Sequence, residues 1–362
     1  MYGILIREGK TTGDIKNIGD FVQSIAQKQF IKDKETRYVE IEELSSIESD
    51  EQVNVIMNGW FMHKPEEFPP AQCINPLFIS FHLTPPKEKD FFTPQTINYL
   101  KKYQPIGARD YQTVEIMERH GIQAYMSGCL TLTLGKEYGG QTHDGKYLIV
   151  DPYIELGGDL RMSLTKQLFK TLYWGIKYFM KAYKLQHKYI YQHTLGAKLP
   201  KNISRFLEAA TFYAIYSERF ADEILLNADF KSVIVDNHLS IEKKFELADS
   251  MLREYSKAKF VITSRLHVAF PCLAMNTNNV FVVPSQENED KIVNRYTGRL
   301  KGLEDTVTIL ELNKGKIVNT QANPNIPSKI SVNNIPENKL GYKKYSDLLL
   351  GKVSNFIRLN QE

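Results

Sequence analysis

Short apolar runs alternate with helix-like repeats along the chain, and this alternation limits the folds that the sequence can adopt. A chain built in this way forms parallel sheets with helices on both faces. In the first part, the spacing of apolar residues predicts a helix over 21–30, and Asp110 is placed to cap a helix that runs to about 120. The pattern predicts strands at 2–6, 37–41, 53–57, 76–81, 104–108 and 122–126, with a further helix at 94–102.

The alternation resumes after a glycine-rich segment at 135–146. At 362 residues, the chain is long for one compact domain. We therefore expect an α/β fold of two Rossmann-like domains whose parallel sheets face one another across a cleft. In this second part, the pattern predicts strands at 147–150, 188–192, 231–235, 259–263 and 280–283, and helices at 163–184, 202–215, 241–257, 266–275 and from about 288.

The expected domain boundaries follow from these patterns. Residues 1–140 would form the N-terminal Rossmann-like domain and residues 141–318 the C-terminal one. Residues 319–362 begin with a segment rich in Asn and Pro, which predicts an irregular connection. An apolar stripe from Tyr345 to Ile357 then predicts a helix that must pack on another surface, for which the first domain is the candidate.

Composition excludes several classes of protein. The first residues, MYGILIREGK, lack the features of a signal peptide, and no run of about 18 apolar residues predicts a membrane span. Cys73, Cys129 and Cys272 lie far apart without C-x-x-C spacing, which speaks against a disulfide framework and a structural zinc site. We expect a cytoplasmic protein with no nucleic-acid partner.

Positive charge is concentrated in one segment, although the formal charge of the whole chain is only +4. Between Leu160 and Leu207 there are ten Lys or Arg residues and no Asp or Glu, which favours an anionic partner. The segment is either a face for an anionic membrane or a lipid-pyrophosphate sugar carrier, or an ordinary solvated helix that Gly175 interrupts. On the predicted helix, a lysine stripe lies opposite an apolar stripe; the first holds Lys166, Lys170, Lys177, Lys181 and Lys184, and the second Leu168, Leu172, Ile176, Phe179 and Tyr183.

A cation and an imidazole follow the strand predicted at 259–263, in the stretch TSRLHVAFPCLAMN. In open parallel sheets, ligands bind at the carboxyl ends of strands, near helix N-termini. The guanidinium of Arg265 suits a carboxylate or a phosphate, and His267 could exchange a proton near neutral pH. The alternative is structural: the arginine packs over the surface and the histidine bonds to a backbone carbonyl.

This stretch resembles the polysaccharide pyruvyl transferase family, together with PIGARDYQTVEIMERHGIQAYMSGCLTLTL at 105–134 and NIGDFVQSIAQ at 17–27. The similarity runs in order from about Asn17 to about Asn294. It implies a fold like that of GT-B glycosyltransferases. It also implies transfer of a pyruvyl group from phosphoenolpyruvate to two hydroxyls of a sugar, forming a cyclic ketal in a capsular or other extracellular polysaccharide or its precursor.

The resemblance also implies which residues form the site. The family tends to place a lysine after the strand that follows its Arg-Leu-His motif, and here that lysine corresponds to Lys291. The Gly-x-Pro often found ahead of that strand is replaced in this chain by residues 276–279. The family's Arg-Leu-His falls on Arg265, Leu266 and His267, its Arg-Asp on Arg109 and Asp110, and its Asn-x-Gly-Asp on Asn17, Gly19 and Asp20.

The residue types agree with this chemistry. Phosphoenolpyruvate carries a carboxylate and a phosphate, for which Arg109, Arg265 and Lys291 would supply cations. Protonation of its methylene carbon and attack by a hydroxyl call for a group that titrates near neutrality, for which His267 is the candidate. No step requires a metal or an organic cofactor. The acceptor would be a sugar, either free or on a lipid-linked oligosaccharide.

Each remaining candidate has two interpretations. His82 follows a predicted strand and could contact phosphate or acceptor, or bond to its own loop. Asp20 could hold an acceptor hydroxyl or act as a base, or form a capping box with Asn17. Arg109 could bind a ligand or pair with a surface carboxylate. The whole chain could also be a GT-B glycosyltransferase that uses a nucleotide sugar, or a noncatalytic protein that binds sugars or anions, because fold alone does not decide function.

Overall fold

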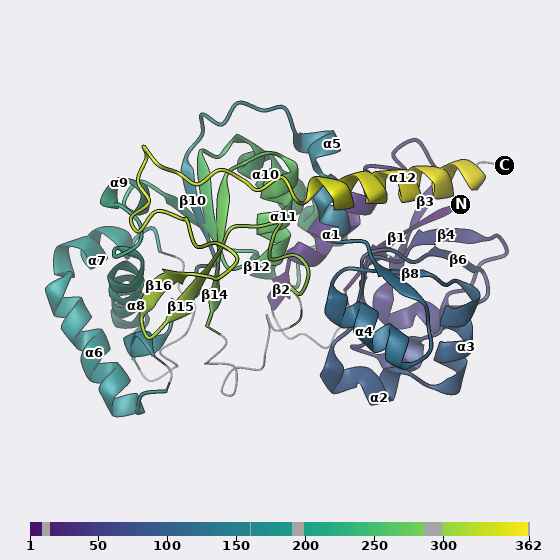
Figure 1. The fold of residues 1–362 in the computed structure, drawn as a ribbon, viewed down its shortest axis with the longest axis horizontal. Helices are drawn as coiled ribbons and strands as arrows, with labels where there is room; N and C mark the ends of the chain where they lie inside the picture. The colour runs from purple at the N-terminus through teal and green to yellow at the C-terminus, as the bar shows by residue number, and fades with distance from the viewer. Residues whose placement is uncertain (9–14, 160, 190–198, 286–297, 299, 361–362) are drawn as a thin grey trace.

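The computed structural model describes residues 1–8, 15–159, 161–189, 199–285, 298 and 300–360. Figure 1 shows two α/β halves side by side, with the C-terminal helix lying across the first half. The mixed α/β architecture, with parallel strands in both halves, confirms the predicted fold class. None of the helices in these ranges is both long enough and apolar enough to cross a lipid bilayer.

The first half contains two parallel sheets of four strands. The run at 76–81, predicted as one strand, is divided between them, because Ser80 has a left-handed backbone with φ 54° that ends the extended run. The strand order is β3 (Thr36–Glu40), β1 (Tyr2–Ile6), β4 (Val53–Ile56) and β6 (Ile74–Leu77) in one sheet, and β5 (Gly59–Trp60), β7 (Phe81–His82), β8 (Ile106–Ala108) and β9 (Ala124–Met126) in the other.

The second half is built on one sheet of six strands. Its last two strands form an antiparallel hairpin that the sequence analysis missed. The turn of this hairpin places Lys314 and Gly315 at φ 51° and φ 80°, as a tight two-residue turn requires. The strand order is β11 (Asp229–Lys231), β10 (Tyr147–Val150), β13 (Phe260–Thr263), β14 (Asn279–Pro284), β15 (Ile309–Asn313) and β16 (Lys316–Asn319).

The two halves share a hydrophobic core and one pair of strands. Strand β2 (Ile15–Asn17) pairs antiparallel with β12 (Ile234–Asp236), so the run predicted as one strand at 231–235 divides between β11 and β12. One core cluster joins buried residues of β1 to residues of the second half, such as Leu252 and Val268. The helices between the halves are α1 (Gly19–Lys28), α10 (Ile241–Lys257) and α11 (Leu266–Ala274).

The C-terminal helix α12 (Lys343–Leu359) buries Leu349 and Val353 in this shared core. The Tyr2 hydroxyl donates to the carbonyl oxygen of Ile357 at 3.2 Å, so α12 contacts the first strand of the chain. The other helices are α2 (Glu88–Phe91), α3 (Pro94–Lys102), α4 (Tyr111–Arg119), α5 (Gly135–Tyr138), α8 (Lys201–Tyr216) and α9 (Asp222–Leu225).

The helix predicted at 163–184 is two helices, α6 (Leu164–Lys177) and α7 (Phe179–Leu185). The break falls at Tyr178, while Gly175 lies inside α6 with its Cα facing Leu207 of α8. Lys188 and Tyr189 form a turn and not the start of a strand, and the rest of that predicted strand lies outside the described residues, as does the helix predicted from 288.

The buried side of α6 is neither the predicted lysine stripe nor the predicted apolar stripe. The side that packs inward contains Gln167, Thr171 and Trp174, which lie against Gly157 and Gly158. The predicted apolar stripe is exposed; it consists of Leu168, Leu172, Ile176, Phe179 and Tyr183.

Candidate functional site

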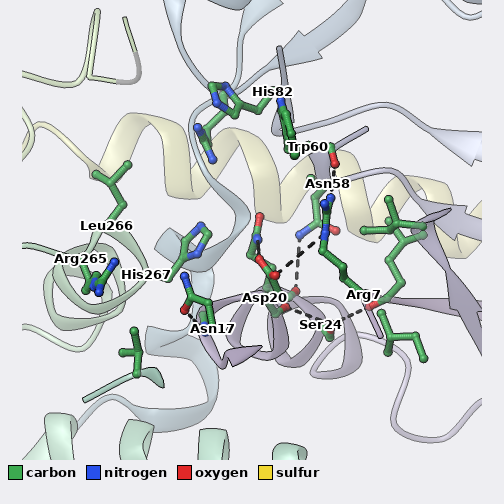
Figure 2. A pocket seen from close by; sticks show the side chains of 18 of the residues that line it. Arg7, Asn17, Asp20, Ser24, Asn58, Trp60, His82, Arg265, Leu266 and His267 are labelled. Carbon is green, nitrogen blue, oxygen red and sulfur yellow. Dashed lines mark hydrogen bonds and ion pairs between the residues drawn. The ribbon is translucent and has the colours of Figure 1, made fainter. Parts of the chain in front are cut away.

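A pocket of about 340 Å³ lies between residues of the two halves. Its walls come from β1, α1 and the loops after β4 and β8 on one side, and from the start of α11 on the other. Figure 2 shows His267, Asp20, Arg7 and His82 arranged around it. Six of the predicted site residues line this pocket, namely Asp20, His82, Arg109, Arg265, Leu266 and His267; Lys291 lies outside the described residues.

Arg265 is the N-cap residue of α11, directly after β13. Its backbone N–H donates to Thr263 Oγ1 at 3.0 Å, which fixes the turn between strand and helix. Its Nε donates to Asp151 Oδ2, also at 3.0 Å, so the inner edge of the guanidinium is held by a carboxylate at the end of β10. Among the described residues, no hydrogen bond engages its two terminal amino groups, which are the donors that a carboxylate or phosphate would need.

His267 lies in the first turn of α11, where its backbone (φ −78°, ψ 17°) departs from helical geometry. Gly19 packs directly against it: a Cβ at Gly19 would lie 3.1 Å from His267 Nδ1 and 3.0 Å from Asn17 Oδ1. The absence of a side chain at Gly19 therefore allows the start of α1 to approach the imidazole.

Asn17 and Asp20 do not form a capping box. Helix α1 begins at Gly19, with Ile18 as N-cap and no capping side chain, and Asn17 Oδ1 instead accepts from the backbone N–H of Gly19 at 2.9 Å. The carboxylate of Asp20 lies 3.9 Å from Arg7 Nε and accepts a long bond of 3.5 Å from Gln23. Asp20 is partly exposed and lines the pocket, so its carboxylate is accessible to a ligand.

Arg109, Asp110 and His82 form a buried cluster beside the pocket. Asp110 caps α4, as predicted: its Oδ1 accepts from the Thr113 N–H at 2.9 Å. Its Oδ2 lies 2.8 Å from His82 Nδ1 and 3.5 Å from Arg109 Nε. Burial raises the pKa of Asp110, but the attraction of His82 and Arg109 outweighs it and holds that pKa below its ordinary value.

Arg109 is not a surface arginine, since only 5% of it is exposed and its carboxylate partner Asp110 is fully buried. Its Nη2 is buried and has no hydrogen-bond partner among the described residues. A buried guanidinium nitrogen without an acceptor is energetically unfavourable, so a ligand oxygen in the adjoining pocket would stabilise it.

Arg7 is a pocket residue that the sequence analysis missed. Its Nη2 donates to the Trp60 carbonyl oxygen, and its guanidinium carbon lies 5.3 Å from the centre of the Trp60 ring. Glu42 is 3.7 Å from its Nη1. The signal was present in the sequence: Arg7 directly follows the first apolar strand, as Arg109 and Arg265 follow later strands.

The pocket therefore presents three guanidiniums, each beside a fixed carboxylate, and three imidazoles, those of His63, His82 and His267. This arrangement suits a small dianion and a proton transfer. Burial raises the pKa of the nearby Cys129, which keeps it a thiol and argues against a nucleophilic role. Within the described residues, no group of three or more His, Cys, Asp or Glu side chains is arranged to hold a metal ion.

Comparison with known proteins adds one finding. No curated protein sequence matches the chain. A family model described as polysaccharide pyruvyl transferase matches residues 17–286, which include pocket residues from Asn17 at the end of β2 to His267 in α11. Because that match covers well over half of the sequence, in agreement with the resemblance of its motifs, the chain belongs to the polysaccharide pyruvyl transferase family.

Proposed function

We propose that this transferase moves the pyruvyl group of phosphoenolpyruvate onto two hydroxyls of a sugar in a cell-surface polysaccharide or its precursor. The main support is that Arg109, Arg265 and His267, from different halves of the chain, line one pocket. Two guanidiniums can bind the phosphate and the carboxylate of this donor. A volume of about 340 Å³ also falls within the range of small-molecule sites, roughly 300–1,000 Å³.

In the proposed reaction, His267 protonates the methylene carbon of phosphoenolpyruvate, which leaves an oxocarbenium-like centre at C2. A sugar hydroxyl adds to C2 and gives its proton to a base, for which Asp20 is the candidate. The bond from C2 to the phosphate oxygen then breaks, and phosphate departs with the electron pair. The second hydroxyl adds to C2 and loses its proton, so that one donor and two hydroxyls yield one ketal and one phosphate.

The first-half wall of the pocket is suited to the acceptor. Trp60 offers an indole surface against which a sugar ring can pack, and Asp20 and Asn58 offer groups that hydrogen-bond to hydroxyls. Arg7 holds the Trp60 backbone and ring in place. The acceptor is proposed to be a sugar, free or carried on a lipid-linked oligosaccharide, and the reaction as written uses no metal or organic cofactor.

The proposal is tested by phosphate release from phosphoenolpyruvate with a panel of free and lipid-linked glycans, and by mass spectrometry for the added pyruvyl group. We expect release only when an acceptor is present. His267→Ala should lower turnover by at least about 100-fold, as expected for loss of a general acid, and should leave the melting temperature unchanged. His238→Ala, at an exposed position, is the matched control.

Binding of the donor is measured separately by calorimetry. Arg265→Ala should weaken phosphoenolpyruvate binding, while Arg119→Ala, on the surface at the end of α4, should not. Turnover of His267→Ala at the wild-type rate would remove the acid assignment. Consumption of a nucleotide sugar in place of phosphoenolpyruvate would refute the proposed donor and favour a glycosyltransferase.

A further inference from the structure

Helices α6 and α7 expose an apolar surface at the end of the molecule farthest from the first half, on the left in Figure 1. Ile176 is 80% exposed, Met180 74% and Phe169 69%. We call this surface the α6–α7 ridge and define it by Leu164, Phe169, Ile176, Phe179, Met180 and Tyr183. No residue of the ridge lines the pocket. Large apolar side chains exposed in this number on two consecutive helices are typical of a site of association.

Lysines lie along one side of the ridge. At 100° per residue, Lys166, Lys170 and Lys177 share one flank of α6, next to the arc that holds Phe169 and Ile176. Lys170 Nζ lies 4.9 Å from the centre of the Trp174 ring, and Lys177 Nζ lies 4.9 Å from that of Tyr178. The ammonium groups of Lys170 and Lys177 therefore lie over aromatic rings at the distance of a cation–π contact.

The charge of this region selects the class of partner. The sequence from Arg161 to Phe206 contains no carboxylate, and of the lysines on α6 and α7 only Lys181 forms an ion pair among the described residues, with Asp222. A second copy of the chain joined through the same face would bring lysines against lysines, which is unfavourable. The surface of an anionic lipid bilayer offers phosphates to the lysines and acyl chains to the apolar ridge.

We propose that the α6–α7 ridge docks on the surface of an anionic phospholipid bilayer. Apolar side chains beside a basic flank on a surface helix are the features of a helix that lies in the membrane interface. The ridge would enter the boundary between head groups and acyl chains, and Lys166, Lys177 and Lys184 would contact lipid phosphates. This inference goes beyond the proposed reaction and does not depend on it.

The test is co-sedimentation of the full chain with phosphatidylcholine vesicles that contain or lack phosphatidylglycerol. We expect binding to the anionic vesicles, weakened by added salt because exposed charges are screened. Replacing Lys166 and Lys177 by Ala should reduce the vesicle partition coefficient by roughly fivefold per lysine. The double variant Phe169→Ser/Ile176→Ser should reduce it at least about tenfold, since two large apolar side chains no longer enter the lipid.

Matched controls lie elsewhere on the surface. Leu340→Ser, at a side chain 61% exposed, and Lys102→Ala, at the end of α3, should bind like the wild type. Thermal melts check that every variant is folded. Absence of sedimentation with anionic vesicles would overturn the proposal, as would equal sedimentation with both vesicle types. Light scattering that shows a dimer lost in Phe169→Ser/Ile176→Ser would instead assign the ridge to a second copy. No readout uses turnover, so failure here leaves the proposed reaction standing.

Discussion

The buried carboxylate of Asp110 connects the stability of the first half to the pocket, and two substitutions separate its roles. Asp110→Asn keeps an oxygen that can accept from the Thr113 N–H but removes the negative charge beside His82 and Arg109. Asp110→Ala removes both. Leaving a buried charge without its partner costs about 3 kcal/mol or more, and losing a helix cap costs about 1 kcal/mol.

Because the Asp110 side chain is fully buried, solvent does not reduce these values. We expect Asp110→Asn to lower the free energy of unfolding by about 3 kcal/mol and Asp110→Ala by about 4 kcal/mol. In a domain of this size, a loss of 3 kcal/mol lowers the melting temperature by roughly 6–12 °C. Asp50→Asn, at an exposed position, is the control and should melt like the wild type.

The melting temperatures of the wild type and of Asp110→Asn, compared at several pH values, test whether the charge of Asp110 is the cause. The pKa of Asp110 is lower in the folded chain than its ordinary value, so its charge stabilises the fold fully above the unfolded-chain pKa of about 3.9. That contribution is lost as the pH falls through the lower folded value. The difference in melting temperature between wild type and Asp110→Asn should therefore shrink in acid. A difference that stays constant from neutral to acid pH, or Asp110→Asn as stable as wild type, would refute this reasoning.

Two further predictions concern glycines that pack closely against other segments: Gly19 against His267 in the pocket, and Gly135 against the end of α11. Gly19→Ala should leave the free energy of unfolding equal or raise it by up to about 1 kcal/mol, because Ala favours helix, yet it should lower turnover about tenfold, because the new Cβ displaces His267. The control is Gly351→Ala in α12, where a Cβ would meet nothing within 4 Å. Unchanged turnover in Gly19→Ala would show that the imidazole tolerates the contact. Gly135→Ala should destabilise the fold by about 3 kcal/mol in thermal unfolding, because its Cβ would meet the Ala274 carbonyl oxygen at 2.1 Å, and a wild-type melting temperature would contradict this packing.

Local patterns predicted much of the fold because burial imposes them residue by residue. The strand at 147–150 and the helix at 241–257 agree with β10 and α10 to the residue. The runs at 76–81 and 231–235 each serve two sheets, and that division depends on the backbone of Ser80 and on pairing with distant β2. An amphipathic pattern also does not show which of its stripes another helix will cover. The exposed side of α6 could therefore not be predicted without the position of α8.

Part of the candidate site could also be predicted from the sequence. Arg109 and Arg265 each follow an apolar parallel strand, where ligands commonly bind, so each position could be predicted. Their strands belong to different sheets, so only the tertiary structure shows that both side chains line one pocket. Arg7 has the same position after β1 but lacked a recognisable motif. The carboxylates that anchor these arginines, such as Asp151 and Glu42, come from distant segments, and only tertiary packing reveals these pairings.

The contact between α12 and β1 affects how the chain folds during synthesis. Tyr2 and Ile357 are separated by 355 positions, yet they are hydrogen-bonded and share one core. A ribosome delivers β1 long before α12, so the apolar side chains that α12 covers stay uncovered until α12 has been synthesised. For that interval the nascent first half is unfinished, and a chaperone that shields apolar surface would bind it there.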